Sequence, residues 1–156
     1  MLAKRTAKID SSGIRKVFDL ARALEDPVNF SIGQPHFDVP DEVKKAAISA
    51  IEAGRNRYTL TQGIPELIEA VKARLRDVKG MSGANPTLIT SGVSGGILLA
   101  CLALVEEGDE VLVPDPYFVM YKHLVNLLGG TPVFIDTYPD FRLTEDALEE
   151  KGFLIL

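Results

Sequence analysis

Apolar and polar positions alternate with a helical rhythm in the first half of the chain. Apolar residues recur every three or four positions in residues 12–24, 41–54 and 65–80, which predicts three amphipathic helices. The third of these is the clearest, because Pro65 stands in its first turn and Gly80 follows its last apolar position. We therefore expect a helical first half.

The other two predicted helices begin at polar residues that can act as N-caps. Ser11 or Ser12 precedes the first helix, and Asp41 stands at the start of the second. Between these helices, residues 25–40 contain Gly33 and three prolines. Such a composition predicts an irregular segment with a short extended piece.

From residue 86 the rhythm changes, and short apolar runs alternate with helical patterns. We expect strands at residues 86–90, 110–114, 132–137 and 153–156, with helices at 95–108, 117–130 and 144–152. Apolar strands that alternate with helices, joined by short turns of Gly, Pro and Asp, predict a parallel sheet covered on both faces. Ligands of such sheets bind beyond the carboxyl ends of the strands.

The junction SGVSGG at residues 91–96 follows one of these predicted strands and precedes a helix. A helix that starts near Gly95 offers free backbone N–H groups and a positive dipole end, and Ser94 adds a hydroxyl donor. The junction has neither the lysine of a Walker loop nor G-x-G-x-x-G spacing. The pattern therefore favours a single phosphate on a small cofactor over a nucleoside triphosphate or a dinucleotide.

Two other interpretations of this junction remain open at this point. The run from Gly92 to Gly96 matches G-x-S-x-G, which would make Ser94 a nucleophile. That reading needs a later acid and histidine, but His36 precedes the serine and His123 lies in a helical pattern typical of a partly exposed surface residue. The third interpretation is a purely structural turn, since Gly and Ser are common between a strand and a helix.

Composition narrows the classes of function. The formal net charge of -5 argues against a nucleic-acid partner. The single cysteine, Cys101, excludes a disulfide within the chain and a cysteine-rich zinc site, and its apolar surroundings predict burial. No apolar run is long enough to span a bilayer, so we expect no membrane partner and a cytoplasmic location.

Six stretches then occur in an order and spacing that match a known family: SIGQPHFDVP, RYTLTQGIPELIEAV, LITSGVSGGILLA, GDEVLVPDPYFVMY, GGTPVFID and FRLTEDALEE. With them the chain resembles the N-terminal part of a pyridoxal-phosphate-dependent aminotransferase of class I/II, with the aspartate aminotransferase-like fold. The resemblance implies an α/β fold: N-terminal helices and a loop, followed by part of a mostly parallel-sheet large domain. Residues 1–40 would contribute to the small domain and the active-site entrance, and residues 41–156 to an incomplete cofactor-binding domain.

The resemblance also implies roles for individual residues. Val93 and Ser94 would present backbone N–H groups to the phosphate of pyridoxal 5′-phosphate, and Ser94 would add its hydroxyl. Phe118 would stack on the pyridine ring, for which a flat apolar face is sufficient; without the motif it would be read as a core aromatic. Tyr58 would reach the phosphate of the neighbouring subunit in a homodimer. Gly33 would place its backbone beside the substrate carboxylate.

Amino-group transfer from an amino acid to a 2-keto acid is the function that the resemblance implies. The lysine that forms the Schiff base with the cofactor lies further on in the family, so we expect no catalytic residue here and a chain that is inactive alone. A truncated product or one half of a split gene would explain this. Lyase or synthase chemistry within the fold, or a non-catalytic binding or dimerisation module, are the alternatives.

An uncovered apolar face is the last expectation from the sequence. The run ILLACLALV, residues 97–105, is apolar nearly all round, so its helix requires neighbours on several sides. Residues 153–156 would form a strand with no covering helix after it. We therefore expect the isolated chain to self-associate or to unfold readily.

Overall fold

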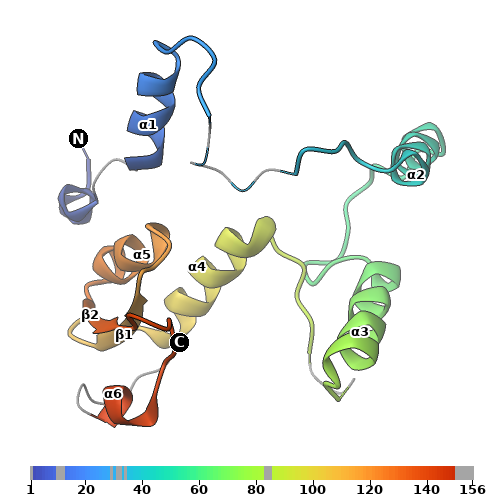
Figure 1. The fold of residues 1–156 in the computed structure, drawn as a ribbon. Helices are drawn as coiled ribbons and strands as arrows, with labels where there is room; N and C mark the ends of the chain where they lie inside the picture. The colour runs from blue at the N-terminus through green and yellow to red at the C-terminus, as the bar shows by residue number, and fades with distance from the viewer. Residues whose placement is uncertain are drawn as a thin grey trace. The chain divides into compact units, whose positions relative to one another are not determined.

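The computed structural model describes residues 2–9, 13–28, 30, 33, 35–82 and 86–149. The chain divides into two compact units, one formed by Met1–Leu24 with Ser91–Leu156 and the other by Glu25–Thr90 (Figure 1). The predicted caps Ser11 and Ser12 and the predicted strand at 153–156 lie outside the described residues.

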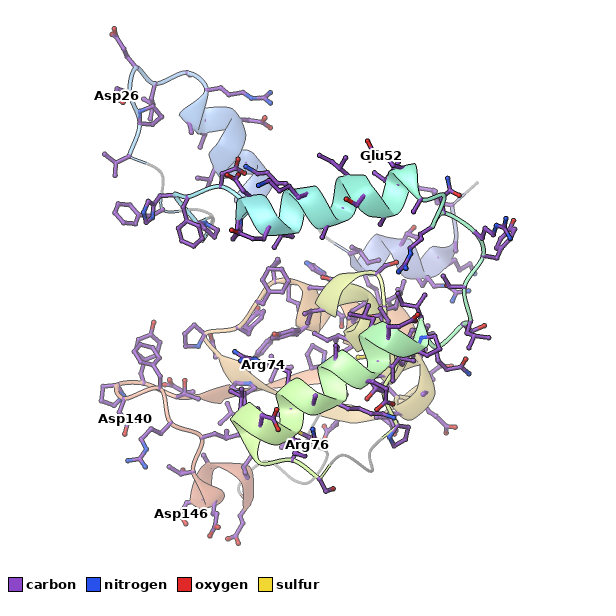
Figure 2. The ribbon with its side chains drawn as sticks, turned by 90° about the vertical axis from the view of Figure 1, so that its right-hand side faces the viewer. Asp26, Glu52, Arg74, Arg76, Asp140 and Asp146 are labelled. Carbon is purple, nitrogen blue, oxygen red and sulfur yellow. The ribbon has the colours of Figure 1, made fainter. Side chains whose placement is uncertain are left out.

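The unit Glu25–Thr90 contains two helices, α2 (Asp41–Glu52) and α3 (Pro65–Lys79). Both were predicted, and Gly80 ends α3 in the left-handed conformation with a φ of 64°. Charged side chains such as Glu52 on α2 and Arg76 on α3 are exposed (Figure 2). Neither helix buries a residue completely.

Asp41 does not cap α2, which corrects the expectation from the sequence. The N-cap is Pro40, and Asp41 is the first helical residue. The Nζ atom of Lys44 lies 3.6 Å from an Asp41 carboxylate oxygen and 2.6 Å from one of Asp38. The Asp41 carboxylate therefore faces a cation, and it favours the helix through the macrodipole instead of a side-chain hydrogen bond to the backbone.

The strand predicted at residues 86–90 is absent, because this segment has no ladder partner among the described residues. The N–H of Ile89 instead donates to the carbonyl of Gln62, 3.0 Å away, in the loop before α3. The Ile89 side chain packs so close to Gly63 that a Cβ there would lie 2.5 Å from Cγ1 of Ile89. The apolar run is thus held by a loop and not by a sheet.

The unit formed by Met1–Leu24 and Ser91–Leu156 contains the remaining elements. They are η1 (Lys4–Lys8), α1 (Gly13–Ala21), α4 (Gly92–Leu104), β1 (Glu110–Asp115), α5 (Met120–Leu128), β2 (Thr131–Asp136) and α6 (Glu145–Glu149). The strands β1 and β2 pair in parallel, from Glu110 opposite Thr131 to Asp115 opposite Asp136. Both strands were predicted. Thr144 caps α6, because its Oγ1 accepts a hydrogen bond of 3.3 Å from the N–H of Ala147.

One apolar core joins α4, β1 and α5. Its buried members are Cys101, Val105, Val111, Leu124 and Val125. Val111 and Val125 are each only 2% exposed, so small branched side chains form its centre. The predicted burial of Cys101 is confirmed, since 3% of this residue is exposed.

The end of α4 lies at the beginning of the sheet. A Cβ atom on Gly130, just before β2, would lie 3.2 Å from Cγ1 of Val105 and 3.1 Å from the carbonyl oxygen of Asp109. Thirteen helical residues and six strand residues both extend about 20 Å. The helix therefore runs antiparallel to β1, and its first turn lies at the carboxyl end of the strand.

Apolar side chains remain exposed on the other side of α4. Leu99 and Leu102 are 48% and 56% exposed. This is the uncovered apolar face expected from the sequence, since the helix uses only one side for the core.

Replacing Val125 with Ala will lower the free energy of unfolding by about 2 kcal/mol, because buried methyl groups are lost and a cavity remains. The matched control is Val93→Ala, which removes the same atoms from a side chain that is 78% exposed. The control will change the free energy by no more than about 0.5 kcal/mol. Denaturant unfolding of the three proteins measures both effects, and equal losses would contradict the assignment of the core.

The exposed side of α4 will cause self-association of the chain. We expect size-exclusion chromatography to show an elution volume that falls as the protein concentration rises, and Leu102→Gln to weaken this trend by removing an exposed apolar side chain. A monodisperse monomer with a sharp, concentration-independent melt would show that the described units bury enough apolar surface on their own.

Candidate functional site

The first turn of α4 exposes backbone donors at the carboxyl end of β1. The helix begins at Gly92 after the N-cap Ser91, three residues earlier than the sequence suggested. Gly92 has a φ of 69°, a left-handed conformation that side chains disfavour, which explains the glycine at this position. Val93 and Ser94 are therefore first-turn residues, whose N–H groups have no acceptor within the helix.

The surroundings of this turn suit an anion. Val93 and Ser94 are both exposed, and no acidic residue lies in the first turn of α4. The dipole of a helix of thirteen residues adds a partial positive charge at this end. The turn can therefore accept a phosphate group through backbone N–H groups and the Ser94 hydroxyl.

Phe118 lies in the loop between β1 and α5. The helix predicted from residue 117 begins only at Met120, so Phe118 is outside it. Phe118 is 49% exposed, and its ring meets the ring of Tyr121 edge to face, with centroids 5.9 Å apart. This exposure does not fit a core aromatic and leaves much of the ring open to a flat partner.

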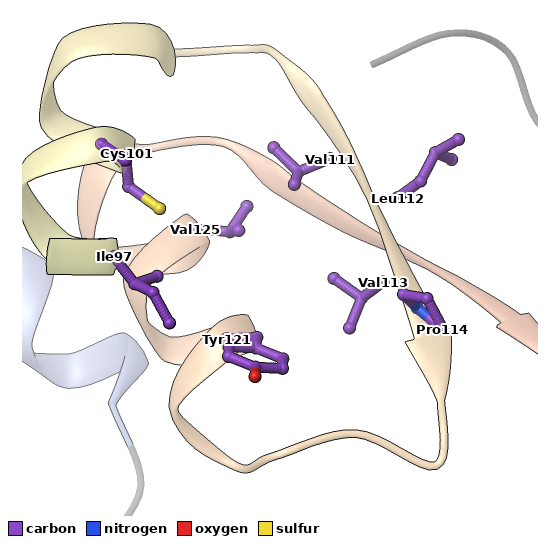
Figure 3. Close-up of a pocket in the computed structure, with 9 residues that line it drawn as sticks. Ile97, Cys101, Val111, Leu112, Val113, Pro114, Tyr121 and Val125 are labelled. Carbon is purple, nitrogen blue, oxygen red and sulfur yellow. The ribbon is translucent and has the colours of Figure 1, made fainter. Parts of the chain in front are cut away.

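The loop that holds Phe118 and the first turn of α4 lie at the same end of the sheet. In Figure 3, Cys101 of α4 lies at the level of Val111, and Ile97 at the level of Val113, further along β1. Earlier residues of α4 therefore face later residues of β1, in agreement with the contact between Val105 and Gly130. The structure brings Val93, Ser94 and Phe118 to one edge of one unit.

A cavity of about 400 Å³ lies beside this edge (Figure 3). It is lined by Ile97, Ala100, Cys101, Val111, Leu112, Val113, Pro114, Tyr121 and Val125. Four consecutive residues of β1 line this cavity, although successive side chains of a strand point to opposite faces of the sheet. The cavity therefore runs along the side of β1 that is not hydrogen-bonded to β2. Its apolar lining is unsuited to a phosphate.

The nucleophile interpretation of Ser94 finds no support. His123 lies within α5, its Nδ1 atom is buried without a hydrogen-bond partner, and no hydrogen bond joins it to Ser94 in the described part of the chain. Cys101 is no better candidate, because burial raises the pKa of its thiol and keeps it protonated.

Tyr58 and Gly33 belong to the unit Glu25–Thr90. Tyr58 is fully exposed and lines a shallow hollow with Asn56 and Arg57. Apart from its chain neighbours, no atom of the described residues lies within 4 Å of the place that a Cβ on Gly33 would take, so these residues do not require a glycine there. The roles of both residues stay predictions.

Metal and membrane sites are not found in the residues that the structure describes. These residues contain no group of three or more His, Cys, Asp or Glu side chains that could hold a metal ion. None of their helices is long and apolar enough to cross a bilayer.

Comparison with known proteins connects this geometry to a family. The family model Aminotransferase class I and II matches residues 25–152. The chain belongs to this family. An aromatic-amino-acid aminotransferase of Thermococcus litoralis is 38% identical and covers 96% of the chain, which covers 39% of that protein. An aspartate aminotransferase of Pyrococcus abyssi is 35% identical, with the same coverage.

Solved structures of the family confirm the expected α/β fold. An aspartate aminotransferase of Thermus thermophilus with maleate matches with a TM-score of 0.88 at 31% identity, over 98% of this chain and 42% of its own. An aminotransferase of Mycobacterium tuberculosis matches with a TM-score of 0.85 at 34% identity, over 96% and 40%. The chain thus spans about two fifths of the length of the aminotransferases that it matches.

Two aromatic contacts near the site were missed in the sequence. Tyr121 follows Phe118 by three positions, a spacing that places two side chains on one side of a helical turn and could have been noticed. The stacking of Tyr117 on Phe134 had no such signal, because the two residues lie in separate elements.

The alkaline stability of the chain will depend on Cys101. Burial raises the pKa of its thiol above the ordinary value of 9.0, so the unfolded chain ionises first as the pH rises. The free energy of unfolding will then fall above pH 9, by at most about 1.4 kcal/mol per pH unit from this group. Denaturant unfolding between pH 7 and pH 10 measures the fall, and Cys101→Ala will remove this part of it. Identical slopes in both proteins would refute the prediction.

Proposed function

We propose that this chain binds pyridoxal 5′-phosphate for the transfer of an amino group from an amino acid to a 2-keto acid, and that it is inactive alone because it lacks the lysine that forms the Schiff base. The proposal rests mainly on the first turn of α4, which is exposed, contains no acidic residue and lies at the same end of the sheet as Phe118. Membership of the aminotransferase family supports it. The names of the relatives include aspartate and aromatic amino acids. The proposal therefore concerns the reaction class and not the amino acid.

The residues of this chain fit the two ends of the cofactor. A phosphate needs several N–H donors and no competing carboxylate, and the turn around Val93 and Ser94 meets both conditions. A pyridine ring needs a flat apolar surface, which the half-exposed ring of Phe118 offers. When bound, pyridoxal phosphate acts as an electron sink for the α-carbon of the amino acid.

Each of these residues would bind or orient, and none would transfer a proton. Val93 and Ser94 would hold the phosphate through N–H groups and one hydroxyl, and Phe118 would orient the pyridine ring by offering it a flat apolar face. In the proposed homodimer, Tyr58 would add a hydroxyl donor to the phosphate of the neighbouring subunit. Gly33 would bring backbone close to the substrate carboxylate. We further propose a cytoplasmic location.

Titration with pyridoxamine 5′-phosphate will test this proposal, because this compound has the ring and the phosphate but lacks the aldehyde that reacts with exposed lysines. We expect amide NMR shifts at Val93–Gly95, and at least about tenfold weaker binding of pyridoxamine, which lacks the phosphate. Ser94→Ala will weaken binding by about threefold to tenfold through the loss of one hydrogen bond to a charged group.

Two controls separate specific binding from a general effect of charge. Ser49→Ala removes a hydroxyl from an exposed position of α2 and will leave the affinity unchanged. Inorganic phosphate will shift the same amides of α4 without affecting the resonances of Phe118. Shifts confined to other regions, or equal affinities for pyridoxamine with and without the phosphate, would reject the proposal.

A further inference from the structure

The loop after β1 carries two consecutive aromatic residues that point to different elements. Tyr117 stacks on Phe134 of β2, with ring centroids 4.9 Å apart and planes inclined by 24°. Phe118 meets Tyr121 of α5 at 75°, and its carbonyl accepts a hydrogen bond of 3.0 Å from the N–H of Tyr121. The ring of Tyr117 thus attaches the loop to β2, and Phe118 attaches it to α5.

The attachment to the sheet depends chiefly on the stacked pair. Before the loop, the N–H and the hydroxyl of Thr137 donate to the carbonyl of Asp115, at 3.1 and 2.7 Å, and hold the ends of both strands together. Beyond that point Pro116 has no N–H to donate. In the described residues, the ring contact between Tyr117 and Phe134 is the next link from the loop to β2.

Phe134 is not explained by the core. It is 39% exposed, whereas Ile135, its neighbour on the opposite face of β2, is 3% exposed. The ring of Phe134 therefore serves mainly as a surface on which Tyr117 lies. Its removal would leave the buried residues of the core in place.

We propose that Phe134 is a positioning residue for the ring of Phe118. By holding Tyr117 against β2, it fixes the backbone from which Phe118 extends, and so the direction of the face that would meet the cofactor. The part of this inference that concerns the cofactor rests on the proposed function. The part that concerns the mobility of position 118 does not.

The chain has no tryptophan, so Phe118→Trp introduces a single indole as an optical reporter. In this background, Phe134→Leu will increase the amplitude of the fast local motion of the indole in time-resolved fluorescence anisotropy. Phe134→Tyr keeps the ring and will restore the restricted motion. Thermal melts of each variant report whether it folds, since a lost fold would abolish the slow anisotropy component as well.

Phe141→Leu is the matched control. Phe141 lies in the same unit and contacts Tyr138, with centroids 5.0 Å apart, but does not touch the loop of Phe118 in the ring contacts of the described residues. Its substitution will leave the motion of the indole unchanged. An unchanged motion in Phe134→Leu, or the same increase in Phe141→Leu, would overturn the inference.

Quenching of the indole by pyridoxamine 5′-phosphate supplies the second measurement. We expect Phe134→Leu to weaken this binding by about threefold to tenfold, the range of one aromatic contact, while inorganic phosphate binds at α4 with unchanged affinity. Equal affinity for pyridoxamine 5′-phosphate in both proteins would overturn the role toward the cofactor. Absence of binding in every variant would count against the proposed function, and the anisotropy would still decide whether Phe134 positions the loop.

Discussion

The antiparallel packing of α4 on β1 is the constraint on which the candidate site depends. The end of α4 lies close to the start of β2, because a Cβ on Gly130 would lie only 3.2 Å from Cγ1 of Val105. With the end of α4 thus held at the beginning of the strands, a helix as long as the strand must begin at the other end. The exposed N–H groups around Val93 and Ser94 lie at the carboxyl end of β1 for this reason, and parallel α/β sheets bind ligands at that end.

The same constraint separates the residues that stabilise the unit from those that would bind. The core residues Cys101, Val111 and Val125 are almost completely buried and apolar. Val93, Ser94 and Phe118 are exposed and add little to the core. A site of this kind can change its side chains without loss of the fold.

Local pattern was enough to predict the elements that form this arrangement. The apolar runs of β1 and β2, Pro65 and Gly80 at the ends of α3 and Thr144 before α6 carry their signals within a few residues. The strand at residues 86–90 was wrong because a strand requires a neighbour, and that neighbour is not encoded in the run itself. The start of α4 at Gly92 depends on a left-handed glycine, and glycine permits this conformation without requiring it.

The aromatic contacts of the site show where a reading of the sequence reaches its limit. Phe118 was predicted from its motif, but the helix in which it was placed begins two residues later, and Tyr117 of the same loop stacks on Phe134 of β2. A contact such as that of Tyr117 with Phe134, 17 positions apart, gives no periodic pattern in the sequence. In the proposed arrangement it nevertheless sets the direction of the next side chain, Phe118. The phosphate-binding turn differs in kind, since it is made largely of backbone. Its donors follow from the position of the helix start alone, and the side chain of Val93 is free to remain in solvent. The ring-binding part of the site therefore depends on particular side chains, and the phosphate-binding part on the fold.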